Sequence, residues 1–76
     1  MEHVEYEKRR REALKKYEDF KEITLKQLDF THSLEFDKLP NSEKFFHQTK
    51  YTYMHGYLNC LRVELDNIIS EEKEIF

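Results

Sequence analysis

Residues that interrupt regular structure are almost absent from this chain of 76 residues, which contains one glycine and one proline. Few turn-forming residues predict few turns, and few turns in a short chain are typical of long helices. The single cysteine, Cys60, excludes a disulfide framework and a zinc site built on cysteine pairs. We therefore expect a reducing, intracellular setting. No stretch reaches the roughly 20 apolar residues that a membrane-spanning helix requires.

A large charge of one sign is also lacking. The net charge is −3, from 13 basic and 16 acidic residues, and residues 1–30 hold eight of each sign. This balance excludes the strong positive field on which non-specific nucleic-acid binding depends. The segment from Met1 to Glu5 is charged and has no apolar run behind it, so it is not a signal peptide. We expect a complete, cytoplasmic protein, and its wealth of Lys, Glu, Tyr, Phe, Ile and Leu is typical of small proteins of AT-rich bacteria and their phages.

The first predicted element is a helix over about residues 3–30. On a helical wheel its apolar residues cover an arc of about 140°: Tyr6, Ala13, Leu14, Tyr17, Phe20, Leu25 and Leu28. Val4, Ile23 and Phe30 fall outside that arc. Acidic residues precede basic ones by four positions, which is the favourable order for helical ion pairs. These pairs are Glu5–Arg9, Glu7–Arg11, Glu12–Lys16 and Glu22–Lys26.

Residues 31–41 form the predicted connection. Ser33 and Asp37 have side chains that compete for backbone hydrogen bonds, and Pro40 favours an extended Leu39. We expect this connection to be partly ordered, with a helical turn around residues 33–38, and to cover one end of the helices. Asn41 or Ser42 is expected to cap the next helix.

The second long helix is predicted over about residues 42–72. Its apolar residues cover about 180° of the wheel, nearly twice what one neighbouring helix needs: Phe46, Tyr51, Tyr53, Met54, Tyr57, Leu58, Cys60, Leu61, Leu65, Ile68 and Ile69. A strand over residues 49–57 is the competing interpretation, and the unbroken helical period on both sides excludes it. Gly56 is either a tolerated glycine or a point of close approach by another backbone.

These patterns predict an all-α fold, one domain over residues 1–76, with two long antiparallel helices in a helical hairpin. Because the second helix has more apolar surface than one neighbour covers, we expect two hairpins to form a homodimeric four-helix bundle. Another protein covering the same surface is the alternative. Either way, the hypothesis is a small regulatory or accessory protein that acts by protein–protein interaction.

The predicted partner-binding residues lie along the second helix: Tyr51, Tyr53, Tyr57, Leu58, Leu61, Leu65, Ile68 and Ile69. The aromatic group around them also includes Phe45 and Phe46. Tyrosine is enriched in binding hot spots, although aromatic residues at helical spacing are most often core residues.

A dimeric nucleic-acid-binding regulator is the second hypothesis. Its contacts would come from the basic run, through Lys8, Arg9, Arg11, Lys15 and Lys16. The competing interpretation is a solvated face neutralised by neighbouring acids. We expect the stem of Arg10 to cover the edge of the core while its guanidinium reaches water.

Residues that carry chemistry are few and scattered. His47 and His55 lie two helical turns apart with Tyr51 between them, and only His32 could supply a third ligand. A solvent-facing pair is the simpler expectation, and a metal site would have to be built across a dimer axis. Cys60 is expected to be buried as a small hydrophobic residue. We therefore expect no enzyme, no cofactor and no small-molecule substrate.

Overall fold

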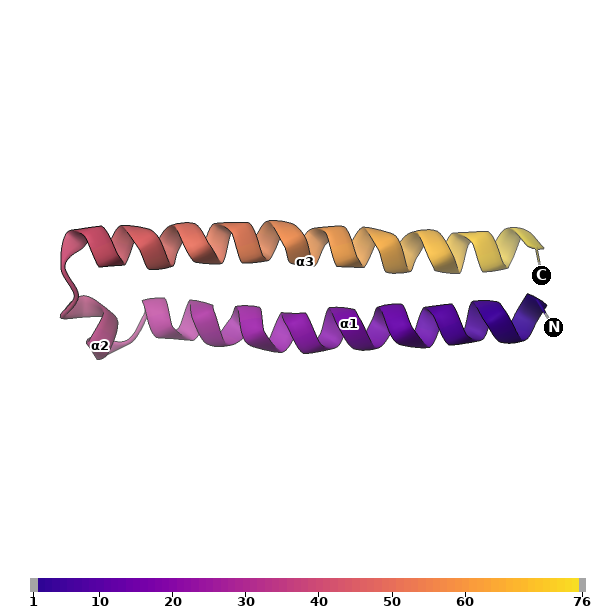
Figure 1. The fold of residues 1–76 in the computed structure, drawn as a ribbon, viewed down its shortest axis with the longest axis horizontal. Helices are drawn as coiled ribbons and strands as arrows, with labels where there is room; N and C mark the ends of the chain where they lie inside the picture. The colour runs from indigo at the N-terminus through magenta and orange to yellow at the C-terminus, as the bar shows by residue number, and fades with distance from the viewer. Residues whose placement is uncertain (1, 76) are drawn as a thin grey trace.

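The computed structural model describes the backbone of residues 2–75 and the side chains of residues 4–74. Its helices are α1 (Glu2–Thr31), α2 (Leu34–Asp37) and α3 (Asn41–Ile75). Helices α1 and α3 run antiparallel side by side, and α2 lies at the end where they are joined (Figure 1). The rod measures 55 × 14 × 12 Å. This arrangement confirms the predicted all-α helical hairpin.

The observed ends of the helices differ from the predicted ones mainly in α3. Helix α1 matches its prediction closely, whereas α3 continues to Ile75, beyond the predicted end near residue 72. The predicted cap at Asn41 or Ser42 is wrong, because α3 begins at Asn41 and Pro40 therefore holds the cap position. The backbone N–H groups of Glu43 and Lys44 both donate to the Pro40 carbonyl at 3.0 Å.

The connection is ordered by Ser33 and Phe36. The Ser33 hydroxyl donates to the Phe30 carbonyl at 2.6 Å and accepts from the Phe36 backbone N–H at 3.2 Å, so it caps α2. The Phe36 side chain is only 5% exposed, and its ring meets that of Phe30 edge-on at 6.0 Å. The expected helical turn therefore exists, and it covers the end of the hairpin.

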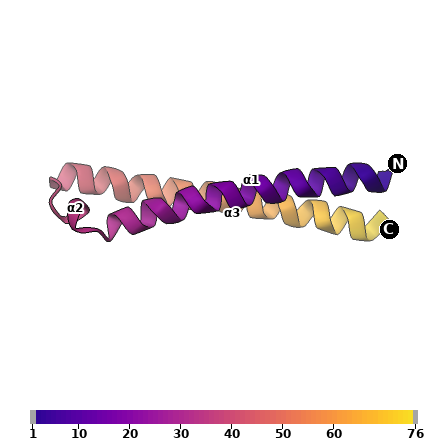
Figure 2. The same ribbon diagram turned by 90° about the horizontal axis from the view of Figure 1, so that it is seen from below.

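The two long helices meet along a seam with a seven-residue repeat. Its members alternate at steps of three and four residues, and all are buried or half-buried. In α1 they are Tyr6, Arg10, Ala13, Tyr17, Phe20, Thr24, Gln27 and Thr31. In α3 they are Lys44, His47, Tyr51, Met54, Leu58, Leu61, Leu65, Ile68 and Glu72. A spacing of 3.5 residues is that of a coiled coil, and the two helices cross over one another in Figure 2.

The apolar core lies in the half of the rod that holds the termini. Ala13, Leu65 and Ile68 form it, with Tyr6 and Ile69 packed against its edge. The small side chain of Ala13 leaves room for the two larger residues of α3. At this end the side chain of Arg10 is 42% exposed, and its guanidinium also pairs at 3.1 Å with Glu72, whose side chain is 13% exposed.

Several residues assigned to the apolar arcs lie outside the seam. Leu14, Leu25 and Cys60 are exposed, so the expectation of a buried Cys60 is wrong. Thr24 and Gln27, which the arcs omitted, lie in the seam instead. Part of the difference arises because a straight helix drifts about 20° per seven residues from a coiled-coil repeat. Thr24 falls within the arc of α1 and is absent from it only because it is polar. A wheel drawn at 100° per residue accumulates that error along the chain.

Two further expectations concern α3 and the membrane. A Cβ added at Gly56 would meet no atom within 4 Å, so within the described hairpin no other backbone approaches this glycine closely. Within residues 2–75, neither long helix combines the length and apolar character needed to cross a bilayer.

Candidate protein-interaction surface

The half of the rod nearest the connection, residues 20–58, has a polar seam. Thr24 is 2% exposed, and its hydroxyl donates to the Phe20 carbonyl at 2.8 Å. The Gln27 amide nitrogen donates to the His47 carbonyl at 3.2 Å and lies 3.3 Å from His47 Nδ1. Thr31 donates to the Leu28 carbonyl at 2.6 Å. Of these bonds, the Gln27–His47 contacts join α1 to α3, whereas Thr24 and Thr31 donate to carbonyls of their own helix.

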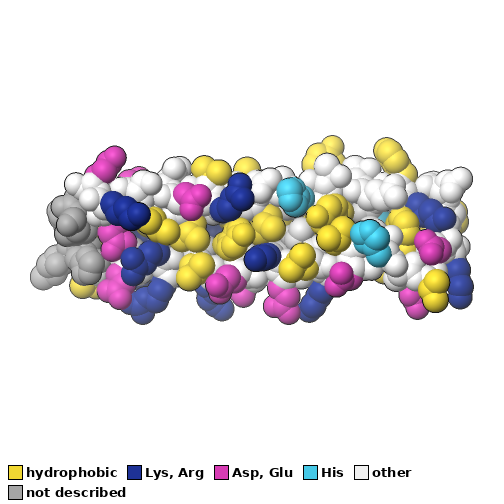
Figure 3. Space-filling model, turned by 180° about the vertical axis from the view of Figure 1, so that it is seen from behind, with side chains coloured by type: hydrophobic (Ala, Val, Ile, Leu, Met, Phe, Trp, Pro, Cys, Tyr) yellow, Lys and Arg dark blue, Asp and Glu magenta, His cyan; other side chains and the backbone are white. Residues whose placement is uncertain are grey.

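The outside of the same half is apolar. Among the described residues, seven of the ten large hydrophobic side chains that remain exposed belong to it: Ile23, Leu25, Leu34, Phe45, Phe46, Tyr53 and Tyr57. Figure 3 shows hydrophobic side chains protruding along the α3 edge on the side of the connection. This half therefore combines exposed aromatic rings with a seam in which Thr24 and Gln27 lie beside the half-buried Phe20, Met54 and Leu58.

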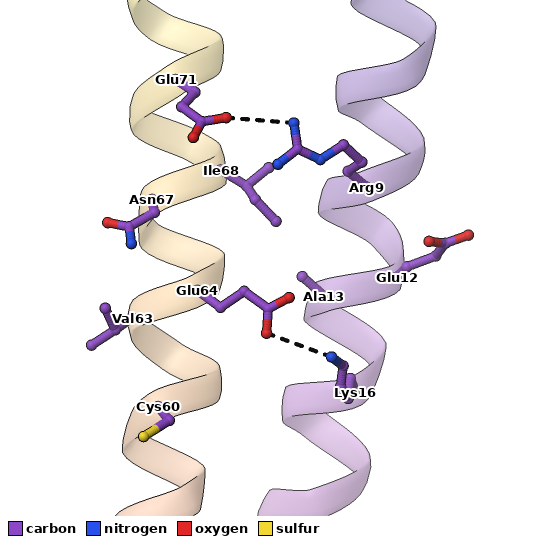
Figure 4. Close-up of a pocket in the computed structure, with 10 residues that line it drawn as sticks. All are labelled: Arg9, Glu12, Ala13, Lys16, Cys60, Val63, Glu64, Asn67, Ile68 and Glu71. Carbon is purple, nitrogen blue, oxygen red and sulfur yellow. Dashed lines mark hydrogen bonds and ion pairs between the residues drawn. The ribbon is translucent and has the colours of Figure 1, made fainter.

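Ion pairs between the helices show which residues share one flank of the hairpin. Arg9 pairs with Glu71 at 3.4 Å, and Lys16 pairs with Glu64 at 3.5 Å (Figure 4). The two pairs border an open groove of about 470 Å³ that also reaches Cys60. Each residue of the second pair lies seven positions from its counterpart in the first. Another step of seven along both helices leads to Ile23 on α1 and Tyr57 on α3. At this position along the flank, two apolar residues therefore replace the ion pair.

Four side chains on this flank form what we call the aromatic stripe: Ile23, Phe46, Tyr53 and Tyr57. Tyr53 follows Phe46 by seven positions, and Tyr57 follows Tyr53 by four, so the three rings share one side of α3. Their exposed fractions are 61% for Phe46, 75% for Tyr53 and 51% for Tyr57. Tyr57 is held in place by an edge-on contact with Phe20, at 4.9 Å between ring centroids.

The predicted partner-binding residues divide between this surface and the seam. Tyr53 and Tyr57 are exposed, whereas Leu61, Leu65 and Ile68 are buried against α1 and offer no surface. Tyr51, Leu58 and Ile69 are half-buried. Two members of the aromatic stripe were missing from the predicted set. Phe46 belongs to the aromatic group noted in the sequence but not to the predicted partner-binding residues. A seven-residue repeat drawn on α1 would place Ile23 on the same flank as Arg9 and Lys16.

The basic run proposed for nucleic acid is largely paired with acids. In addition to the pairs that Arg9 and Lys16 form with α3, Arg11 lies 3.5 Å from Glu7 and Lys15 lies 3.6 Å from Asp19. Among residues 4–74, Lys8 has no such pair. At 100° per residue the five side chains span about 160° of α1, and Glu5, Glu12 and Asp19 lie within the same arc. This geometry gives no continuous basic face.

The two histidines of α3 have different surroundings. His47 is half-buried between Phe30 and Phe46, with ring centroids at 4.8 and 5.3 Å, so the expected solvent-facing pair is wrong for this residue. His55 is exposed and lies beside Tyr51 at 5.9 Å. Within the described residues, no three His, Cys, Asp or Glu side chains are close enough to hold a metal ion.

The fold and this surface define a two-helix hairpin with coiled-coil packing and an exposed aromatic flank. No family model, curated protein or solved structure matches the chain.

Proposed function

We propose that this protein is a small regulatory or accessory protein that binds another polypeptide chain through the aromatic stripe. The observation that carries the proposal is the exposed aromatic surface in the half of the hairpin nearest the connection. Thr24 and Gln27 occupy part of the seam there, while the three aromatic rings of the stripe are more than half exposed. Exposed contiguous apolar patches usually mark interaction sites.

The composition of the stripe fits binding to a protein. Tyrosine is enriched among residues that dominate binding energy, because its ring buries a large area and its hydroxyl still finds a polar partner. A hairpin also presents a long, straight surface that suits a helix laid alongside it. The exposed, unpaired Cys60 fits a reducing compartment, and we infer a cytoplasmic location.

Site-specific photocrosslinking tests this proposal. A benzophenone side chain replaces Tyr53 in one variant and Phe45 in a control, since Phe45 is 70% exposed and lies about 80° from Tyr53 around α3, outside the stripe. After irradiation in a lysate of the native host, we expect a discrete adduct from position 53 and none from position 45. The adduct joins this chain either to a second copy of itself or to another protein.

Competition shows whether the adduct depends on the stripe. Excess unlabelled wild-type protein should suppress it, whereas a Tyr53→Ser/Tyr57→Ser variant should not, provided that circular dichroism shows the variant to be folded. Equal labelling from positions 45 and 53, or equal competition by both proteins, would contradict the proposed function.

A further inference from the structure

We propose that the aromatic stripe binds the same stripe of a second copy of this chain, with the two α3 helices antiparallel about a two-fold axis at Tyr57. This inference rests on the proposed function and adds the identity and register of the partner. The observations that carry it are the order of charges along one side of α3 and the area of the exposed rings.

The side of α3 that carries the stripe is complementary to itself when reversed. At steps of three and four residues it presents Lys50, Tyr53, Tyr57, Cys60 and Glu64. Reversal about Tyr57 places Lys50 opposite Glu64 of the second copy, and Tyr53 beside the second copy's Cys60. A two-fold axis generates each contact twice, as a closed dimer requires. Apolar contacts thus occupy the centre, and opposite charges flank them on both sides.

Lys50 and Glu64 are available for these contacts. Lys50 is exposed and takes part in none of the ion pairs found among residues 4–74. Glu64 pairs with Lys16 at 3.5 Å but keeps 48% of its side chain exposed. A carboxylate has two oxygens and accepts from two cations at once. The second ion pair therefore forms without breaking the first.

Other registers are less favourable. A parallel arrangement sets Lys50 against Lys50 and Glu64 against Glu64. An antiparallel arrangement about Tyr53 brings Glu43 close to Glu64 and leaves Lys50 without an acid. The register about Tyr57 also sets Glu43 against Glu71, but these residues lie about 21 Å from the axis at 1.5 Å per residue. Arg9 neutralises Glu71 there at 3.4 Å.

The area of the stripe is what a modest dimer needs. Aromatic residues bury about 150–250 Å² each, so the exposed parts of Tyr53 and Tyr57 amount to roughly 250 Å² per copy. Phe46 lies eleven residues from the axis, opposite Ile68 of the second copy, and is outside this central contact. A standard interface takes about 800 Å² from each partner. The two rings therefore supply about a third, and Ile23 with the flanking charged side chains contributes further area. We expect a reversible dimer whose population depends on protein concentration.

The first test measures the dissociation constant by analytical ultracentrifugation over about a hundredfold range of concentration. Lys50→Glu sets like charges against each other twice, and we expect it to raise the dissociation constant about tenfold or more. The control is Lys73→Glu, which makes the same change of charge at an exposed position on the other side of α3. Equal effects of the two substitutions would overturn the register.

The second test uses disulfide formation under mild oxidation. Tyr57→Cys in a Cys60→Ser background places two thiols at the axis, within reach of a disulfide, and should crosslink rapidly. Tyr53→Cys should crosslink when Cys60 is present and should fail to do so in the Cys60→Ser background. Crosslinking of Tyr53→Cys without Cys60 would indicate an axis at Tyr53 and would overturn the register.

The outcomes separate this inference from the proposed function. If the protein stays monomeric at every concentration but position 53 labels another protein specifically, the inference that a second copy is the partner is wrong. The proposed function is then still supported. If the protein is monomeric and position 53 labels nothing, the result contradicts both the dimer and the proposed function.

Discussion

Replacing Gly56 with alanine should stabilise the protein. The position lies well inside the 35 residues of α3, far from either end, where helix propensity acts in full. The added Cβ meets no atom within 4 Å, and the glycine does not have a positive φ, so no steric or backbone cost opposes the change. Alanine is favoured over glycine in a helix interior by about 0.8–1.0 kcal/mol. In a domain of this size, 1 kcal/mol corresponds to about 4–8 °C in Tm.

Thermal and urea unfolding followed by circular dichroism, at one protein concentration, measure this gain. Asn59→Ala and Asn59→Gly provide a calibration, because Asn59 is exposed in the same helix and the two variants differ by the same alanine-for-glycine exchange. Gly56→Ala should exceed wild type by about the difference between the Asn59 variants. A loss of stability, or no change, would refute the reasoning, because it would mean that another surface packs closely against Gly56.

Two other substitutions test the packing of the hairpin. Leu65→Ala removes a buried core side chain and should lower the free energy of unfolding by about 2–5 kcal/mol, whereas Leu14→Ala, at a position that is 40% exposed, should cost far less. Ser33→Ala removes the cap of α2 and should cost about 1 kcal/mol, accompanied by faster hydrogen exchange at the Phe36 amide. Denaturant unfolding checks the first pair, and exchange monitored by NMR checks the second. Unchanged protection of the Phe36 amide would show that the cap does not hold the connection.

Much of the fold follows from local sequence. Scarce glycine and proline and a helical apolar period are properties of neighbouring residues, and they were sufficient to predict two long helices and their connection. The helical turn beginning at Leu34 was also predictable, because Ser33 offers a cap within its own segment. Local ion pairs behaved likewise: Glu7–Arg11 and Glu22–Lys26 form as expected.

The sequence by itself determined that this chain makes two long helices and that α3 has more apolar surface than α1 covers. Only the tertiary structure decided which side chains face inward. A seven-residue seam places Thr24 and Gln27 inside and leaves Tyr53 and Tyr57 outside, because coiled-coil packing selects every 3.5 residues rather than every 3.6. Arg9 and Lys16 likewise pair with Glu71 and Glu64 on α3 rather than with acids of their own helix. Such choices depend on the register between two helices, which neither helix specifies alone.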